Sequence, residues 1–322
     1  MRSLRMAAAF HAVYANLRTP SQRTLLVAPA VFPESRSLTF PARSKTLITA
    51  VAADRKSFGC KAASSTAGMA AEKGKLKEEI FDSEEELAVA LAKYTAELSK
   101  KFTAERGAFT VVLSGGSLIK SLRKLVEPPY IDSVEWARWH VFWVDERVVP
   151  KDHEDSNYKL AYDGFLSKVP ILPGHVYAIN DALPAEGAAD DYETCLRHLV
   201  KNSVIDLSAA SGFPKFDLML MGMGPDGHVA SLFPGHPLVR EKEKWVTFIA
   251  DSPKPPPTRI SFTFPVINSS SYIAMVVAGA GKANPVQIAL RNGQNSDLLP
   301  VQMVLPEGEM TWFLDKDAAS KL

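Results

Sequence analysis

The chain of 322 residues contains little cysteine, no long apolar run and almost no net charge. Its two cysteines, Cys60 and Cys195, are too few for a disulfide framework or a cysteine metal cluster, and they suit a reducing compartment. No stretch approaches the roughly 20 apolar residues that a membrane helix needs. The hydrophobic content of 46% is nevertheless enough for one large core or two modest ones.

Acidic residues are nearly absent from residues 1–65, which hold ten of the 37 Lys and Arg but only two of the 36 Asp and Glu. The rest of the chain therefore carries a formal charge of −7, which argues against a nucleic-acid partner. The same segment is rich in Ser and Thr and is interrupted by prolines, a composition typical of an organellar transit peptide. Its length and Ser/Thr content favour the plastid over the mitochondrion, and a disordered basic tail is the alternative.

Short apolar runs alternate with helical periods through the rest of the chain. Strands are predicted at residues 109–113, 140–144, 216–221, 245–250, 260–264, 272–278 and 310–314, and helices at 87–102, 118–126, 157–166, 188–201 and after 282. This alternation predicts an α/β fold with a doubly wound, largely parallel sheet flanked by helices. We predict a disordered transit peptide at 1–65, a linker at 66–77, one folded domain at 78–316 and a tail at 317–322.

The stretch with the strongest chemical signal is G-M-G-P-D-G-H-V-A-S-L-F-P, residues 222–234, which follows an apolar run. Three glycines and a proline end the predicted strand, and the resulting loop carries Asp226 and His228. Open α/β sheets commonly bind ligands in such loops. A surface turn with an incidental histidine is the alternative.

Other loops at strand ends could hold an anionic ligand. Ser114-Gly115-Gly116-Ser117 joins a strand to a helix, where backbone N–H groups can bind phosphate, although the segment is not a known nucleotide motif. Asp145-Glu146-Arg147 sets two acids beside a guanidinium. Arg259 follows three prolines, and Lys282 begins a helix. Each of these residues has an ordinary solvated surface role as its alternative.

Taken in order, these segments resemble the 6-phosphogluconolactonase family of the oxidative pentose phosphate pathway. The resemblance rests on S-G-G-S, W-V-D-E-R-V-V-P, Ser156-Asn157, the G-P-D-G-H loop, P-P-T-R-I-S-F-T-F-P and the late G-A-G-K, and it covers residues 78–315. Leu118-Ile119 and Val229 depart from the usual Thr-Pro and Thr of the family. These departures bear on phosphate contacts more than on the activity.

The resemblance implies a carboxylic ester hydrolase that opens 6-phospho-D-glucono-1,5-lactone to 6-phospho-D-gluconate without a metal or other cofactor. His228 would be the general base, because its imidazole titrates near neutral pH. Asp226 would orient the imidazole, and Arg147 would stabilise the oxyanion or orient the sugar. The expected substrate-binding residues are Ser114, Gly115, Gly116, Ser117, Asp145, Asn157, Gly227, Arg259 and Lys282.

Two other functions compete with this interpretation. A glucosamine-6-phosphate deaminase shares the D-G-H loop, but it continues with Phe-Asn-Glu and has Asp-Glu-Tyr where this chain has Ser231-Leu232-Phe233 and Arg147. A non-catalytic sugar-phosphate sensor would need a DNA-binding domain, which the Pro/Ser-rich N-terminal segment does not provide.

The predicted partners are the small-molecule lactone and organellar import receptors, with no nucleic acid and no membrane, and the chain is expected to be a monomer. It closes with Ser320-Lys321-Leu322, which has the form of a peroxisomal import signal. The polar residues before this tripeptide predict a free tail. We therefore expect a plastid enzyme with a peroxisomal fraction.

Overall fold

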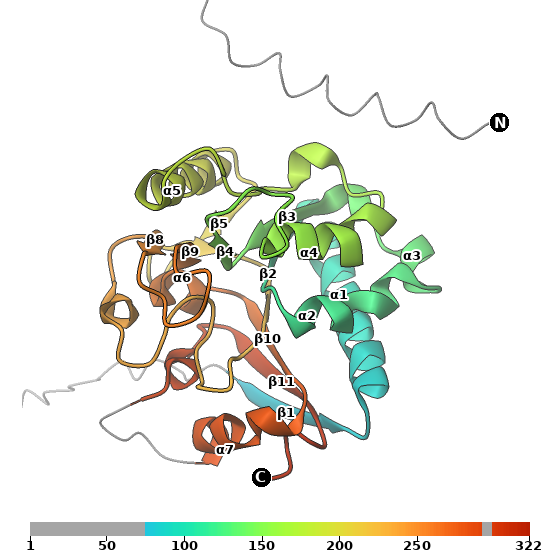
Figure 1. The fold of residues 1–322 in the computed structure, drawn as a ribbon. Helices are drawn as coiled ribbons and strands as arrows, with labels where there is room; N and C mark the ends of the chain where they lie inside the picture. The colour runs from blue at the N-terminus through green and yellow to red at the C-terminus, as the bar shows by residue number, and fades with distance from the viewer. Residues whose placement is uncertain (1–74, 292–297) are drawn as a thin grey trace, which may run out of the picture. The chain divides into compact units, whose positions relative to one another are not determined.

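The computed structural model describes residues 75–291 and 298–322. Its centre is a six-stranded sheet with the strand order β1-β11-β10-β7-β2-β3 (Figure 1). All neighbouring strands in this sheet run parallel, which confirms the predicted fold class. The strands are β1 (Leu76–Phe81), β2 (Phe109–Leu113), β3 (Trp139–Trp143), β7 (Leu218–Met221), β10 (Tyr272–Val277) and β11 (Glu309–Asp315).

The central strands of this sheet are buried on both faces, so their side chains alternate between two hydrophobic cores. In β2, Phe109, Val111 and Leu113 belong to one core, and Val112 belongs to the other. The first core lies under α1 (Glu84–Arg106), α2 (Ser117–Ser121) and α4 (Asn157–Gly164). The second core lies under α5 (Ala185–Lys201), α6 (Phe264–Asn268) and α7 (Ala283–Arg291). A short helix α3 (Tyr130–Ser133) links α2 to β3.

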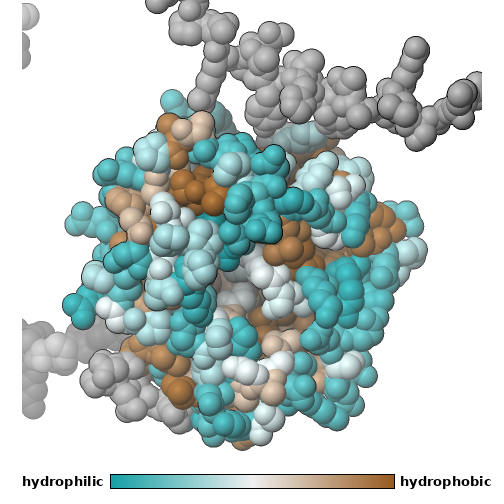
Figure 2. Space-filling view, viewed as in Figure 1, coloured by the Kyte–Doolittle hydropathy of each residue, from teal (hydrophilic) through white to brown (hydrophobic). Residues whose placement is uncertain are grey.

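Apolar side chains are correspondingly sparse on the face that Figure 2 shows. Hydrophilic residues cover most of it, and the hydrophobic ones lie in small separate groups. No helix within residues 75–291 or 298–322 is long and apolar enough to cross a membrane.

A second sheet of three antiparallel strands has the order β4-β9-β8. It contains β4 (Asp145–Arg147), β9 (Arg259–Phe262) and β8 (Val246–Ile249), and a further pair, β5 (Asp206–Leu207) and β6 (Pro214–Lys215), forms a small hairpin. The segments predicted as strands at 245–250 and 260–264 therefore belong to a separate sheet. A backbone hydrogen bond of 2.7 Å from Phe262 to Val144 ties this sheet to the chain just after β3.

Local signals in the sequence set the ends of α1. Ser83 accepts a hydrogen bond from the backbone N–H of Glu86 at 3.2 Å, and the Glu86 carboxylate accepts one from Asp82. Gly107 ends the helix with a positive φ of 75°, and its N–H donates to Thr103. The helix predicted at 118–126 is instead divided into α2 and a 3-10 turn, Leu122–Val126.

The domain is longer at both ends than predicted. Strand β1 begins at Leu76, inside the segment expected to be a linker, and it pairs with β11. The C-terminal tail is also part of the domain, because Ala318 is fully buried and Lys321 donates a hydrogen bond to Asn284 in α7. The tail therefore packs against the domain and does not hang free as expected, although Ser320, Lys321 and Leu322 are themselves exposed. The predicted transit peptide and Cys60 lie outside the described residues.

Candidate active site

A cleft opens at the carboxyl ends of β2 and β7. The chain leaves β2 for β3 on one side and later returns to β7 on the other, so the strand order reverses between these two neighbours. Ligands bind at such a reversal because the loops diverge there. The cleft and its open mouth together enclose about 640 Å³ of space that holds no protein atoms. It is lined by Ser114, Gly115, Gly116, Ser117, Asp145, Arg147, Asn157, Gly222, Met223, Gly224, Pro225, His228, Ala230, Arg259 and Lys282.

Most of the predicted catalytic and substrate-binding residues meet in this cleft, although they come from six separate segments. Asp226 and Gly227 are the two that do not line it. Asp226 instead contacts His228. The backbone carbonyl of Gly227 accepts a hydrogen bond from Val301, and Gly227 adopts a positive φ of 78°. Gly227 therefore shapes the loop instead of facing a ligand.

His228 is held by an acid on one ring nitrogen. Its Nδ1 lies 2.6 Å from Oδ1 of Asp226. Since an ionised carboxylate can only accept hydrogen bonds, Nδ1 carries the hydrogen and Nε2 keeps its lone pair. The imidazole also packs on the ring of Phe233, with 4.6 Å between centroids. The pair thus presents a fixed basic nitrogen in the cleft.

Burial and neighbouring charges set the protonation of this pair. Burial lowers the pKa of His228 and outweighs the opposing effect of Asp226. Burial alone would raise the pKa of Asp226, but hydrogen bonds from Lys254 and His228 lower that pKa to about 2. At neutral pH the side chains are therefore a neutral imidazole and an ionised carboxylate, the states required of a general base and its support.

Lys254 is a member of this cluster that the sequence analysis missed. Its Nζ donates to the same Asp226 oxygen at 2.9 Å and lies 3.3 Å from Nδ1 of His228. Its charge contributes to the lowered pKa of His228. The proline-rich segment considered in the sequence began one residue later, at Pro255. The sequence signal that could have identified Lys254 is its position directly before three prolines, which stiffen the loop that carries it.

The turn that carries this pair leaves no room for a side chain at Gly224. A Cβ atom there would lie 2.0 Å from Cε1 and Nδ1 of His228 and 2.6 Å from Oδ1 of Asp226. The backbone N–H of Gly224 donates to the carbonyl of His228 at 2.9 Å, which closes the loop. Glycine is therefore required here by close approach of the imidazole.

Strand β4 supplies the acid and the guanidinium on the facing wall. Neighbouring residues of a strand point to opposite sides, so Asp145 and Arg147 line the cleft and Glu146 does not. Asp145 accepts a hydrogen bond from Oγ of Ser231 at 2.8 Å. Arg147 donates from Nη1 to the carbonyl of Asp155 at 2.8 Å, while its buried Nε has no partner among the described residues. That donor remains for a ligand.

Arg259 lines the cleft but uses most of its donors within the protein. Its Nε donates to the carbonyl of Pro256, and its Nη2 donates to the carbonyls of Lys254 and Pro255. Its Nη1 is 3.4 Å from Oγ of Ser231, and only 3% of the residue is exposed. One Nη1 hydrogen is thus left for a ligand, and the guanidinium mainly fixes the loop that carries Lys254.

Lys282 and the loop of residues 114–117 form the remaining wall. Lys282 donates to the carbonyl of Met223, and burial together with the charge of Lys254 lowers its pKa. The N–H of Ser114 is already bonded to Leu220 of β7. A side chain at Gly115 would strike the amide of Asn157, at 1.9 Å from Oδ1. Gly116 has a positive φ of 68°, so this bend needs glycine.

No group of three or more His, Cys, Asp and Glu side chains in the described part of the chain could hold a metal ion. The chemistry available in the cleft is that of one neutral imidazole supported by Asp226, the carboxylate of Asp145 and several cations. Such a set suits proton transfer at an anionic ligand.

Comparison with known proteins assigns the chain to a family. Residues 82–312 match the profile of the glucosamine-6-phosphate isomerases/6-phosphogluconolactonase family, and the chain belongs to that family.

Two plant relatives are close in sequence. A protein of Oryza sativa subsp. indica described as "Probable 6-phosphogluconolactonase 4, chloroplastic" is 77% identical over 245 residues, which are 76% of each chain. A protein of Arabidopsis thaliana described as "6-phosphogluconolactonase 3, chloroplastic" is 68% identical over 77% of this chain and 76% of its own length.

Solved structures share the fold. The 6-phosphogluconolactonase of Thermotoga maritima is 30% identical and superposes with a TM-score of 0.63, over 75% of this chain and all of its own. A monomeric glucosamine-6-phosphate deaminase has a TM-score of 0.62 over 76% of this chain and all of its own, but its identity of 20% shows a common fold alone.

Proposed function

We propose that this chain is a carboxylic ester hydrolase that opens 6-phospho-D-glucono-1,5-lactone to 6-phospho-D-gluconate. The observation that carries the proposal is His228, a neutral imidazole that lines the cleft, with Nδ1 bound to Asp226 and with no hydrogen-bond partner for Nε2 in the described part of the chain. The relatives described as 6-phosphogluconolactonases support the choice of substrate. The expectation that no cofactor takes part is retained as part of the proposal.

The reaction begins with removal of a proton from water by Nε2 of His228. The hydroxide forms a bond to the lactone carbonyl carbon, and the carbonyl π electrons move to its oxygen. When this tetrahedral intermediate collapses, the bond from the carbon to the ring oxygen breaks and the imidazolium returns its proton to that oxygen. Asp226 stabilises the imidazolium while it exists, and Lys254 keeps Asp226 ionised.

The cations and amides of the cleft bind the rest of the substrate. Arg147 stabilises the oxyanion or orients the sugar, with its unpaired Nε available. Lys282 and the loop of residues 114–117 bind the phosphate, and Arg259 adds at most one hydrogen bond. Asp145 and Asn157 border the sugar.

Replacement of His228 tests the proposal. His228→Ala should lower kcat/KM for the lactone by about 10²–10⁴-fold, the usual contribution of a general base. His236→Ala is the matched control, because His236 also faces an aspartate, Asp251 at 3.3 Å, but lies outside the cleft lining. The assay follows 6-phosphogluconate through a coupled dehydrogenase and subtracts spontaneous hydrolysis. A folded His228→Ala variant with wild-type turnover would exclude His228 as the base.

The same preparation distinguishes the competing functions. A deaminase would release ammonia from glucosamine 6-phosphate, and a sensor would bind the sugar phosphate without turnover. We expect no ammonia, because Arg147 stands at the cleft where the deaminase pattern has tyrosine, and we expect turnover of the lactone, because His228 lines the same cleft.

The proposed location is the plastid stroma, with residues 1–65 acting as a transit peptide recognised by import receptors. The names of the rice and Arabidopsis relatives support the plastid. A peroxisomal fraction through Ser320-Lys321-Leu322 and a monomeric state are further parts of the proposal. Reporter fusions at either terminus test the location: an N-terminal reporter that stays in the cytosol would remove the peroxisomal part.

A further inference from the structure

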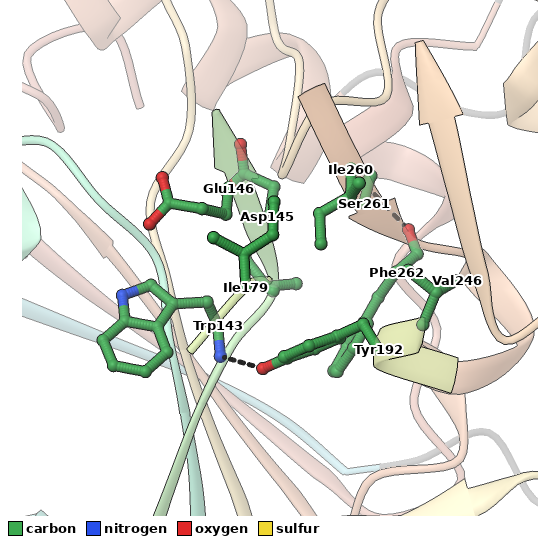
Figure 3. Close-up of a pocket in the computed structure, with 10 residues that line it drawn as sticks. Trp143, Asp145, Glu146, Ile179, Tyr192, Val246, Ile260, Ser261 and Phe262 are labelled. Atoms are coloured by element: carbon green, nitrogen blue, oxygen red, sulfur yellow. Dashed lines mark hydrogen bonds between the residues drawn. The ribbon is translucent and has the colours of Figure 1, made fainter. Parts of the chain in front are cut away.

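Glu146 is a buried carboxylate that the proposed reaction does not use. It lies between Asp145 and Arg147 on β4, but it is not part of the cleft lining, and only 2% of the residue is exposed. Figure 3 shows its carboxylate directed away from Ile260 and Ser261, which lie across the neighbouring apolar pocket. Burying an ionisable group is costly unless it is well hydrogen-bonded. The burial of the Glu146 carboxylate therefore calls for an explanation.

Four donors surround the two oxygens of this carboxylate. Oε1 accepts the backbone N–H groups of Arg147 at 2.7 Å and Asn157 at 2.8 Å. Oε2 accepts the backbone N–H of Tyr158 at 2.7 Å and Oγ of Ser156 at 3.3 Å. Three of these donors stand at the start of α4, where the backbone N–H groups lack partners within the helix.

The carboxylate therefore joins β4 to the start of α4 across the loop of residues 148–155. Both ends of this connection carry cleft residues, Arg147 on the strand and Asn157 on the helix. Nδ2 of Asn157 donates to the carbonyl of Asp145 at 3.0 Å. Nη1 of Arg147 donates to the carbonyl of Asp155 inside the same loop. A shift of the connection would therefore move the guanidinium and the amide together.

We infer that Glu146 is a positioning residue that holds Arg147 and Asn157 at the cleft. The inference rests on the proposed function, because it assigns Glu146 a part in the same reaction. Burial raises the pKa of Glu146 to about 7, while the backbone N–H groups of Asn157, Arg147 and Tyr158 oppose that rise. The ionised carboxylate is the form that accepts hydrogen bonds from all four donors. Glutamine has nearly the same shape but presents an NH2 group to one pair of these donors.

The test is Glu146→Gln. Misplacement of a binding group by about 1 Å can lower the rate on the order of 100-fold. We therefore expect Glu146→Gln to lower kcat/KM for the lactone by about 10- to 100-fold. The matched control is Glu193→Gln. Glu193 is likewise a shielded carboxylate that accepts two backbone N–H groups, those of Trp245 and Val246, but it is outside the cleft lining. The control should lose thermal stability without losing kcat/KM.

A double-mutant cycle separates positioning from a general structural effect. If Glu146 acts through Arg147, Glu146→Gln should cost little more once Arg147 has been replaced by alanine. Full additivity of the two losses would overturn the inference, as would a wild-type kcat/KM for Glu146→Gln. A wild-type protein that does not open the lactone would instead refute the proposed function.

Ser156→Ala covers the case in which Glu146→Gln does not fold. It removes one donor to the carboxylate and the cap of α4, where Oγ of Ser156 accepts from Lys159 at 3.2 Å. The control is Ser83→Ala, which removes the equivalent cap of α1. We expect kcat/KM to fall several-fold for Ser156→Ala and to stay unchanged for Ser83→Ala. Equal activity of the two variants would count against the inference.

Discussion

Gly224→Ala places a single methyl group against the proposed base. The new Cβ would stand 2.0 Å from Cε1 and Nδ1 of His228, whereas ordinary contact begins at 3.4 Å. The imidazole or the loop must therefore shift by about 1.4 Å, the difference between these distances. Gly224 does not have a positive φ, so the backbone itself accepts alanine.

A displacement of this size should lower kcat/KM by on the order of 100-fold, or about 2.7 kcal/mol of transition-state stabilisation. The loss should appear mainly in kcat, because the residues proposed to bind phosphate are not displaced. Michaelis curves on freshly generated lactone, corrected for spontaneous hydrolysis, measure it.

The control is Gly174→Ala, because Gly174 has nothing within 4 Å of its would-be Cβ and lies outside the cleft lining. It should keep wild-type kinetics, and thermal unfolding of both variants should show a folded protein. A folded Gly224→Ala variant with wild-type kcat would refute the reasoning. It would mean either that the imidazole does not sit as described or that its position does not matter for turnover.

Two further predictions concern the lysines. Lys254→Met should move the acidic limb of the kcat/KM–pH profile to higher pH. The Lys254 charge lowers the pKa of His228, so its removal raises that pKa, and the base works only when neutral. An acidic limb at the wild-type pH would contradict the electrostatic role. Lys282→Ala should weaken binding of 6-phosphogluconate, measured by calorimetry, by about 1.5–3 kcal/mol for the lost charged hydrogen bond, with little effect on turnover of unphosphorylated gluconolactone. Equal losses for both ligands would place Lys282 at the lactone end.

The parts of the fold that follow from hydrophobic pattern and capping could be predicted from the sequence. The run of residues 109–113 became β2 because four of its five residues are apolar, as burial on both faces requires; the exception, Thr110, donates a hydrogen bond to Asp217. Strand β1 was missed because most of its residues are exposed and three of the six are charged, as befits the edge of a sheet. The three-residue strand β4 is too short to show any period.

The site was predictable to the extent that its groups lie close together in sequence. Asp226 and His228 share one turn, so their proximity follows from the loop itself. Lys254 reaches the same carboxylate from 28 residues away, through the path of the chain between β8 and β9. Arg259 likewise donates most of its hydrogen bonds to backbone carbonyls that only the folded loop brings within reach. Only the three-dimensional path of the backbone decides such contacts.

The two sheets divide the cleft between them. The loops after β2, β7 and β10 of the parallel sheet carry residues 114–117, His228 and Lys282. Arg147 and Arg259 belong to the small antiparallel sheet, and Lys254 lies in the loop between its strands β8 and β9. For protein engineering, this means that Arg147 can be redesigned on the small sheet, whereas Lys254 and Arg259 cannot be changed independently of the base. Lys254 contacts Asp226, and Arg259 holds the loop that carries Lys254. The same arrangement offers natural selection a route to new sugar phosphates, because a substitution at Arg147 on β4 changes a group that lines the cleft without changing the turn that holds the histidine.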